Sequence, residues 1–193
     1  MNTPSHLLLS LAALRRGDWR PLLWPIAIGA VIADLPMFGF YLYQRWYIGL
    51  PEKALWEDLY FRPEWQLLFD SSHSIPLVAT ILVVAASRES RIWMAFATSW
   101  MLHLAFDLPL HHTDAHRHFL PLSSFRLESP ISYWDPAHLG AYGAAAEVVL
   151  VAICSYRVGR DSPRLWVRIL LGSWVALSAG VWVALYVFGL VPN

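Results

Sequence analysis

The residues with the strongest metal-ligand chemistry are concentrated between positions 103 and 118, where five of the eight histidines lie. His103 and Asp107 are four residues apart, so on a helix their side chains share one face and can reach one cation. Neutral imidazole together with carboxylate suits Zn²⁺, Fe²⁺ or Mn²⁺. The pair therefore predicts a divalent-metal site, and capping or a local ion pair by Asp107 is the alternative interpretation.

A polar segment follows, because Pro109 is expected to end that helix. Several of its side chains could complete the metal site or form a second one: His111, His112, Asp114, His116 and His118. The alternative is that this segment is simply a polar loop.

The composition indicates an integral membrane protein. Hydrophobic residues make up 57% of the 193 residues, charged residues only 15%, and there are 11 tryptophans, as in the aromatic belts of membrane proteins. The formal net charge is zero and the basic residues are dispersed, so a nucleic-acid partner is not expected. The lipid bilayer is the expected partner, and the sequence sets no oligomeric state.

The apolar segments predict an all-α, polytopic membrane helical bundle that forms a single domain over residues 1–193. Residues 5–16 are too short to span a bilayer and predict an N-terminal half-helix. About five membrane segments follow, at 21–46, 74–87, 92–108, 139–157 and 165–190. Residues 47–72 predict a wetter connection, and the proline- and histidine-rich residues 109–138 predict an extramembrane loop.

The basic residues predict the orientation of the bundle. Nine lie on one side of the predicted segments: Arg15, Arg16, Arg20, Arg88, Arg91, Arg157, Arg160, Arg164 and Arg168. Five lie on the other: Arg45, Lys53, Arg62, Arg117 and Arg126. The side richer in Lys and Arg is expected to face the cytoplasm, which places the 109–138 loop on the outer face of the membrane.

Ionisable residues in separate segments are predicted to lie at a similar depth. At ~1.5 Å per helical residue they fall between roughly 14 and 23 Å from the cytoplasmic turns. They are His6, Asp34, His73, His103, Asp107 and Glu147. Buried ionisable groups must pair or bind metal, and this layer has no Lys or Arg, so a bound divalent cation is the simplest explanation.

Four members of this layer have simpler alternatives, besides the one given above for Asp107. His6 and His73 could cap helix starts, and Asp34 could accept hydrogen bonds across the helix packing or carry protons. Glu147 could be hydrogen-bonded within the bundle.

The order of these motifs resembles the membrane-bound metal-dependent hydrolases, a family of small bacterial inner-membrane proteins. The resemblance covers about residues 3–140 and consists of an apolar helix with His6, Asp34 followed by Pro36, a His73-Ser74 pair that opens a helix, and His103-x-x-x-Asp107. That family is in turn similar to the zinc-dependent phospholipase C and single-strand nuclease fold, which is all-helical and holds up to three zinc ions.

The resemblance implies a bacterial inner-membrane location and one to three divalent ions, with zinc expected. It implies that one metal is held by Asp34, His73, His103 and Asp107, and that Asp107 also bridges toward His6 at another. A third metal in the soluble relatives uses two further histidines and a glutamate, which follows the last histidine by four residues. His138 is the candidate for that last histidine here, but Tyr142, not an acid, stands four residues after it. A third site would therefore need other groups, such as His112, His116, His118 or Asp135.

These features predict metal-assisted hydrolysis of a phosphoester or lipid-like substrate. Asp114 or Asp135 is the expected proton acceptor, or the residue that orients another catalytic group. Two alternatives remain: a non-catalytic metal-binding protein of the membrane, and a di-iron oxygenase, which His112-x-x-x-His116 suggests.

Overall fold

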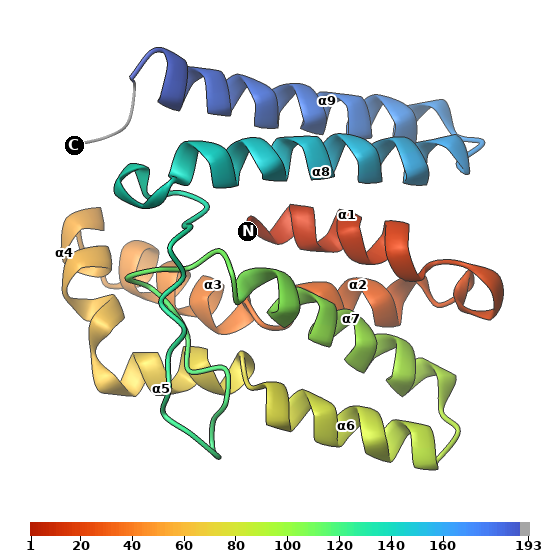
Figure 1. Cartoon of the computed structure of the whole chain (residues 1–193), viewed down its shortest axis with the longest axis horizontal. Coiled ribbons are helices and arrows are strands. Elements are labelled where there is room, and N and C mark those ends of the chain that lie inside the picture. The colour runs from red at the N-terminus through yellow and green to blue at the C-terminus, as the bar shows by residue number, and fades with distance from the viewer. Residues whose placement is uncertain (190–193) are drawn as a thin grey trace.

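A computed structural model describes residues 1–189 of the chain (Figure 1). Helices account for 70% of it, and no strand occurs in residues 1–189. The all-α prediction is therefore confirmed. The last predicted segment, 165–190, ends at Leu190, which lies outside the described residues.

The helices that carry the candidate site pack against one another around the N-terminal helix. Helix α1 (Thr3–Leu14) contacts α2 (Leu23–Val31) and α7 (Arg91–Asp107) on one side and α8 (Gly140–Arg160) on the other. Helix α6 (Ile75–Ser87) packs on α7, and α9 (Leu165–Trp182) pairs with α8 to form a long hairpin. Figure 1 shows this hairpin along one edge of the molecule and α6 along the opposite edge.

Three helices are long and apolar enough to cross a membrane, which is compatible with a membrane location. They are Pro63–Ser87, which joins α5 (Pro63–Ser72) to α6, then α8, and Leu165–Val187, which joins α9 to the π-helix Val183–Val187. The bent pair Leu23–Val31 and Leu35–Tyr47 gives a fourth span if it counts as one. Five spans are therefore not confirmed.

The differences from the predicted spans have local causes. Helix α7 has 17 residues and stops at Asp107, so it falls short of the length of the other spans. The 47–72 connection is not simply a wet linker, because it contains α4 (Glu52–Glu57), the short helix Leu59–Phe61 and α5. Helix α5 then extends α6 to a 25-residue span.

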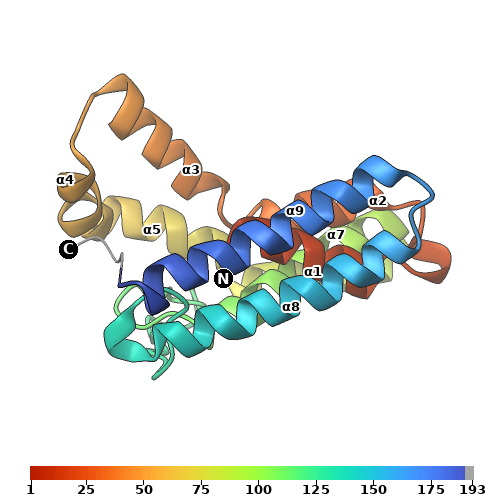
Figure 2. The ribbon, with the colours of Figure 1, turned by 90° about the horizontal axis from the view of Figure 1, so that it is seen from above.

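The segment predicted at 21–46 is divided in two. Pro36 lies in the first turn of α3 (Leu35–Tyr41), and the axis bends by 57° between α2 and α3, which continues as the π-helix Leu42–Tyr47. Figure 2 shows α3 leaving the packed helices at this bend. The break leaves Asp34 at the N-terminal end of α3, beside the bundle core.

A second break, between α5 and α6, positions His73. Helix α5 ends there, and the Ser74 hydroxyl starts α6 by accepting a hydrogen bond from the Leu77 amide at 3.1 Å. Pro76 follows in the first helical turn, where a missing N–H costs nothing. The two breaks therefore bring Asp34 and His73 from helix ends toward the C-terminal end of α7.

Candidate metal centre

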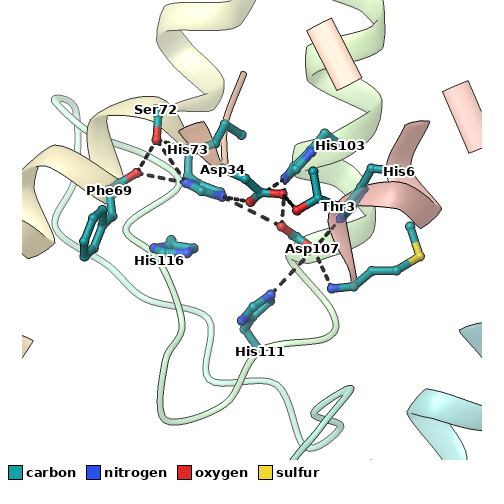
Figure 3. A network of polar contacts seen from close by, with 12 residues as sticks. Thr3, His6, Asp34, Phe69, Ser72, His73, His103, Asp107, His111 and His116 are labelled. Atoms are coloured by element: carbon teal, nitrogen blue, oxygen red, sulfur yellow. Dashed lines mark hydrogen bonds and ion pairs between the residues drawn. The ribbon is translucent and has the colours of Figure 1, made fainter. Parts of the chain in front are cut away.

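Four buried side chains converge where these breaks meet the end of α7 (Figure 3). Asp34, His73, His103 and Asp107 each offer one ligand atom, and these four atoms lie within 4.8 Å of one another. The group could hold a metal ion.

The distances within the group suit a small divalent cation. His103 Nε2 lies 3.0 Å from Asp107 Oδ2 and 3.5 Å from Asp34 Oδ1. His73 Nε2 lies 3.8 and 4.0 Å from the same two oxygens. Tetrahedral ligands about 2.0–2.2 Å from a zinc ion stand roughly 3.3–3.6 Å apart, so these separations are close to those that zinc requires.

The backbone fixes the two imidazoles with their Nε2 atoms toward the carboxylates. His73 Nδ1 donates to the carbonyl of Phe69 at 2.9 Å, and His103 Nδ1 donates to the carbonyl of Ala30 at 2.7 Å. Because Nδ1 is the donor, the neutral form of each imidazole presents a lone pair at Nε2. Neither Nε2 has a hydrogen-bond partner in the described part of the chain. Buried nitrogens without partners, opposed by carboxylates that can only accept, are the donor set that a cation satisfies.

The second oxygen of Asp107 faces a separate group of nitrogens. Its Oδ1 lies 2.9 Å from His6 Nε2, 3.5 Å from His111 Nε2 and 2.8 Å from the amino group of Met1. The His6 ring stacks on that of His103, with 3.7 Å between centroids. Asp107 therefore faces His6 with Oδ1, and it faces His73 and His103 with Oδ2.

His111 is a site residue that the family resemblance does not indicate. Its spacing of four residues from Asp107, the same as that of His103, is the available sequence signal. Asp114 holds its ring, since His111 Nδ1 lies 2.9 Å from Asp114 Oδ2, which also accepts from Trp134 Nε1 at 3.0 Å. Asp114 therefore orients His111.

The ion pair shifts the pKa values of both partners. Burial lowers the pKa of His111, but Asp107 and Asp114 outweigh it and raise the value to about 9. Burial raises the pKa of Asp114, but the bond from His111 outweighs it and brings the value to about 2.

His116 and His118 pack behind His73 rather than joining the four ligands. The His116 ring stacks on His73 with 3.9 Å between centroids, and the His118 ring stands edge-on to His73 at 6.0 Å. Burial lowers the pKa of His116 to about 3 and that of His118 to about 4, so both imidazoles are neutral near pH 7.

A buried carboxylate, Asp70, anchors the histidine-rich loop. It accepts hydrogen bonds from His116 Nδ1 at 3.2 Å, from the amide of Arg117 at 3.0 Å and from Arg126 Nη2 at 3.2 Å, and it pairs with the Arg117 side chain. The sequence gives no signal for this role, because Asp70 stands among the polar residues of the 47–72 connection.

Three predicted site residues of the 109–138 loop, His112, Asp135 and His138, lie apart from the cluster. The rings of His112 and His138 stack on each other at 3.6 Å in the loop. Asp135 binds His138 Nδ1 at 2.7 Å and caps a short helix through the Ala137 amide. These contacts occupy both oxygens of Asp135, so the structure gives no support for its role as a proton acceptor at the cluster.

Glu147 accepts hydrogen bonds from the N-terminal end of α1 and does not join the cluster. Its Oε1 accepts hydrogen bonds from the amide and side chain of Asn2, each at 3.0 Å, and from the Ser5 hydroxyl at 2.6 Å. The N-terminus of a helix needs such acceptors because its first amides have no partners within the helix. The alternative of hydrogen bonding within the bundle therefore describes Glu147.

The pair behind the di-iron alternative is also separated. His112 Nδ1 binds the Ser129 carbonyl at 2.7 Å, whereas His116 binds Asp70. Within residues 1–189, the one ligand group found is that of Asp34, His73, His103 and Asp107.

A pocket of about 470 Å³ reaches the cluster. His73, Asp107 and His111 form part of its wall beside the first residues of α1. Larger side chains complete it: Met37, Phe38, Tyr41, Trp56 and Tyr133. A molecule with an apolar part therefore has access to three of the four ligands, Asp34, His73 and Asp107.

The chain matches none of the protein-family models, curated proteins or solved structures with which it was compared.

Proposed function

We propose that this chain is a membrane-embedded, metal-dependent hydrolase in which Asp34, His73, His103 and Asp107 hold a divalent cation, zinc being the best fit to this donor set. The observation that supports it most directly is the pair of buried Nε2 atoms, on His73 and His103, that lack hydrogen-bond partners and face two carboxylates. We include in the proposal membership of the membrane-bound metal-dependent hydrolases and a location in the bacterial inner membrane with the 109–138 loop outward.

A bound divalent cation supplies Lewis acidity, which polarises a phosphoryl or acyl oxygen. The chain itself does the positioning. The carbonyls of Phe69 and Ala30 fix the two imidazoles, and the Thr3 hydroxyl donates to Asp34 Oδ2. His111, held by Asp114, presents Nε2 at the pocket wall beside Asp107, where it can exchange a proton with a bound substrate.

The walls of the pocket favour a substrate class. Phe38, Tyr41 and Trp56 offer apolar and aromatic surface next to the ligands, which suits an ester or phosphoester that carries an apolar chain. Since three helices are long and apolar enough to cross a membrane, a lipid-like molecule is the substrate proposed.

Metal content and turnover of the detergent-purified protein test this function. Wild type should contain stoichiometric zinc and hydrolyse a phospholipid or a generic phosphoester, and Asp107→Ala should lose both. Asp135→Ala is the matched control, because it removes a carboxylate that contacts His138 and not the four ligands. Wild-type protein that retains no stoichiometric metal after purification would contradict the proposal.

A second candidate is a non-catalytic metal-binding protein. The positions of the ligands favour it. Asp34 and His73 lie at two helix breaks and Asp107 lies at a helix end, so a bound cation would stabilise the packing of these helix ends. Stoichiometric zinc without hydrolysis of any phosphomonoester, phosphodiester or carboxylic ester would decide for this candidate.

A further inference from the structure

Five arginines converge at the end of the bundle far from the metal centre. Arg15, Arg16 and Arg20 follow α1, and Arg157 and Arg160 lie in the last turn of α8. They line a pocket of about 70 Å³ whose apolar part is formed by Leu11, Ala12 and Val158. In Figure 1 this is the right-hand end, where α1 stops and α8 turns into α9.

The chain turns sharply to bring these arginines together. Gly17 has a φ of +49°, a left-handed conformation that glycine adopts without strain, and the short helix Gly17–Trp19 follows. Arg15 Nε then donates to the carbonyl of Arg20 at 3.1 Å, which closes the turn. Arg157 and Arg160 are three residues apart on α8, which packs on α1.

Capping of helix ends accounts for only part of this cluster. Arg16 Nη2 caps α1 by donating to the Ala12 carbonyl at 2.9 Å. At the end of α8 that role belongs to Arg168, whose guanidinium donates to the carbonyls of Gly159 and Ser162 at 2.9–3.2 Å. Arg157 and Arg160 are therefore not needed to cap α8.

The pocket is strongly unbalanced in charge. Asp161 is the carboxylate at its edge, 3.7 Å from Arg160 Nε. Among residues 1–189, no carboxylate lies within 4.0 Å of the side chains of the other four arginines, which are Arg15, Arg16, Arg20 and Arg157. All five guanidinium groups are exposed, so five positive charges against one negative charge favour the binding of an anion from solution, and the guanidinium fork matches phosphate oxygens.

The position of the pocket indicates where the phosphate comes from. Helices α8 and α9 are long and apolar enough to cross a membrane, and the turn that joins them lies beside the pocket. Trp166, in the first turn of α9, is 55% exposed at this level, as is typical of side chains at the membrane surface. We propose that this arginine pocket binds the phosphate of an anionic phospholipid headgroup, independently of any hydrolysis at the metal centre.

The test measures binding of three probes to the full chain in detergent, by native mass spectrometry and by the shift in thermal unfolding. The probes are short-chain phosphatidylglycerol, short-chain phosphatidylcholine and inorganic phosphate. Wild type should bind phosphatidylglycerol at least about tenfold more tightly than phosphatidylcholine, and Arg20→Gln/Arg157→Gln should lose about tenfold or more of that affinity. Arg20→Lys/Arg157→Lys, which keeps both charges but not the guanidinium fork, should lose less of it than the glutamine variant.

The matched control is Arg88→Gln/Arg164→Gln, which removes two arginines from the same end of the bundle but outside the pocket. It should bind phosphatidylglycerol as wild type does, and an unchanged circular-dichroism spectrum and lipid-free unfolding temperature in every variant show that the fold is intact. Equal loss in this control, or equal binding of phosphatidylcholine, would overturn the proposal. Pocket-dependent binding of inorganic phosphate without binding of phosphatidylglycerol would overturn the assignment to a lipid.

Discussion

At the scale of single residues, the candidate site depends on how each ligand is held. Asp34 uses Oδ1 toward the two imidazoles, and its Oδ2 accepts a hydrogen bond from the Thr3 hydroxyl. Asp107 divides its oxygens in the same way, with Oδ2 toward His103 and Oδ1 toward His6. A side chain that hydrogen-bonds to a ligand, as Thr3 does to Asp34, helps to set the orientation and charge of that ligand. Its removal therefore weakens metal binding although all the ligands remain.

We expect Thr3→Ala to weaken cation binding roughly 10- to 100-fold, because Asp34 loses the donor that orients it. Thr3→Ser keeps the hydroxyl and should bind as wild type does. Competition with a chromogenic chelator for zinc measures both affinities. Equal weakening in the two variants would show that the methyl group of Thr3, rather than its hydroxyl, matters.

At the scale of elements, the site depends on the close approach of α2 to α7. A Cβ added at Gly29 would stand 2.2 Å from the backbone oxygen of Phe96 and 3.0 Å from Ser99 Cβ. Glycine is therefore required there, and the contact brings the Ala30 carbonyl within reach of His103.

Gly29→Ala should force α2 away from α7 and lower the free energy of unfolding by about 1–3 kcal/mol. Cation binding should weaken with it, because His103 loses its fixed orientation. Gly39→Ala is the control: an added Cβ meets nothing within 4 Å, and alanine favours a helix over glycine by about 0.5–1 kcal/mol. The unfolding temperature should therefore fall for Gly29→Ala and stay the same or rise for Gly39→Ala.

The 109–138 loop should make the metal-free protein sensitive to acid. Burial lowers the pKa of His118 from 6.5 to about 4, so between these values the unfolded chain binds a proton that the folded chain does not. The free energy of unfolding should therefore be unaffected by this group above pH 6.5 and should fall as the pH drops toward 4.

His118→Asn should flatten this dependence, since asparagine can replace the Nδ1 donor to the His116 carbonyl without titrating. Thermal unfolding of chelator-treated protein at several pH values between 7.5 and 4 measures the difference. If the unfolding temperatures of wild type and His118→Asn changed with pH in parallel, His118 would not be the source of the acid sensitivity.

At the scale of the whole molecule, the four ligands join segments that are distant in the sequence. Asp34 stands between α2 and α3, His73 between α5 and α6, and Asp107 at the end of α7. A ligand that binds only the folded state adds to stability in proportion to the logarithm of its concentration. A cation at this junction should therefore hold the broken helices together.

Removal of metal by a chelator should lower the unfolding temperature of wild type. At a free zinc concentration of about 100 times Kd the bound ion contributes about 2.7 kcal/mol, or roughly 5–10 °C for a chain of this size. Asp107→Ala should unfold at the same temperature with and without zinc. A zinc-independent unfolding temperature in the wild type would contradict the predicted junction.

The sequence alone determined the helical class, and local rules gave a layer of six ionisable residues. The narrower set of Asp34, His73, His103 and Asp107, which the structure brings together as a group that could hold a metal ion, came from the family resemblance. Apolar segments of this length form helices in a membrane, and four-residue spacing places His103 and Asp107 on one helix face. Asp34 and His73 were found because an acid or imidazole inside an apolar segment must have a partner.

Only the tertiary structure decided which further residues approach that group and how many helices are long and apolar enough to cross a membrane. His111 reaches Asp107 because the chain folds back after α7. Glu147 was predicted at the same depth as the ligands, but it accepts hydrogen bonds at the N-terminus of α1 instead. Depth in a membrane fixes one coordinate of a side chain, and rotation and packing of the helices fix the other two. Those depend on contacts between segments distant in sequence, such as that of Gly29 with Phe96, which no local pattern encodes.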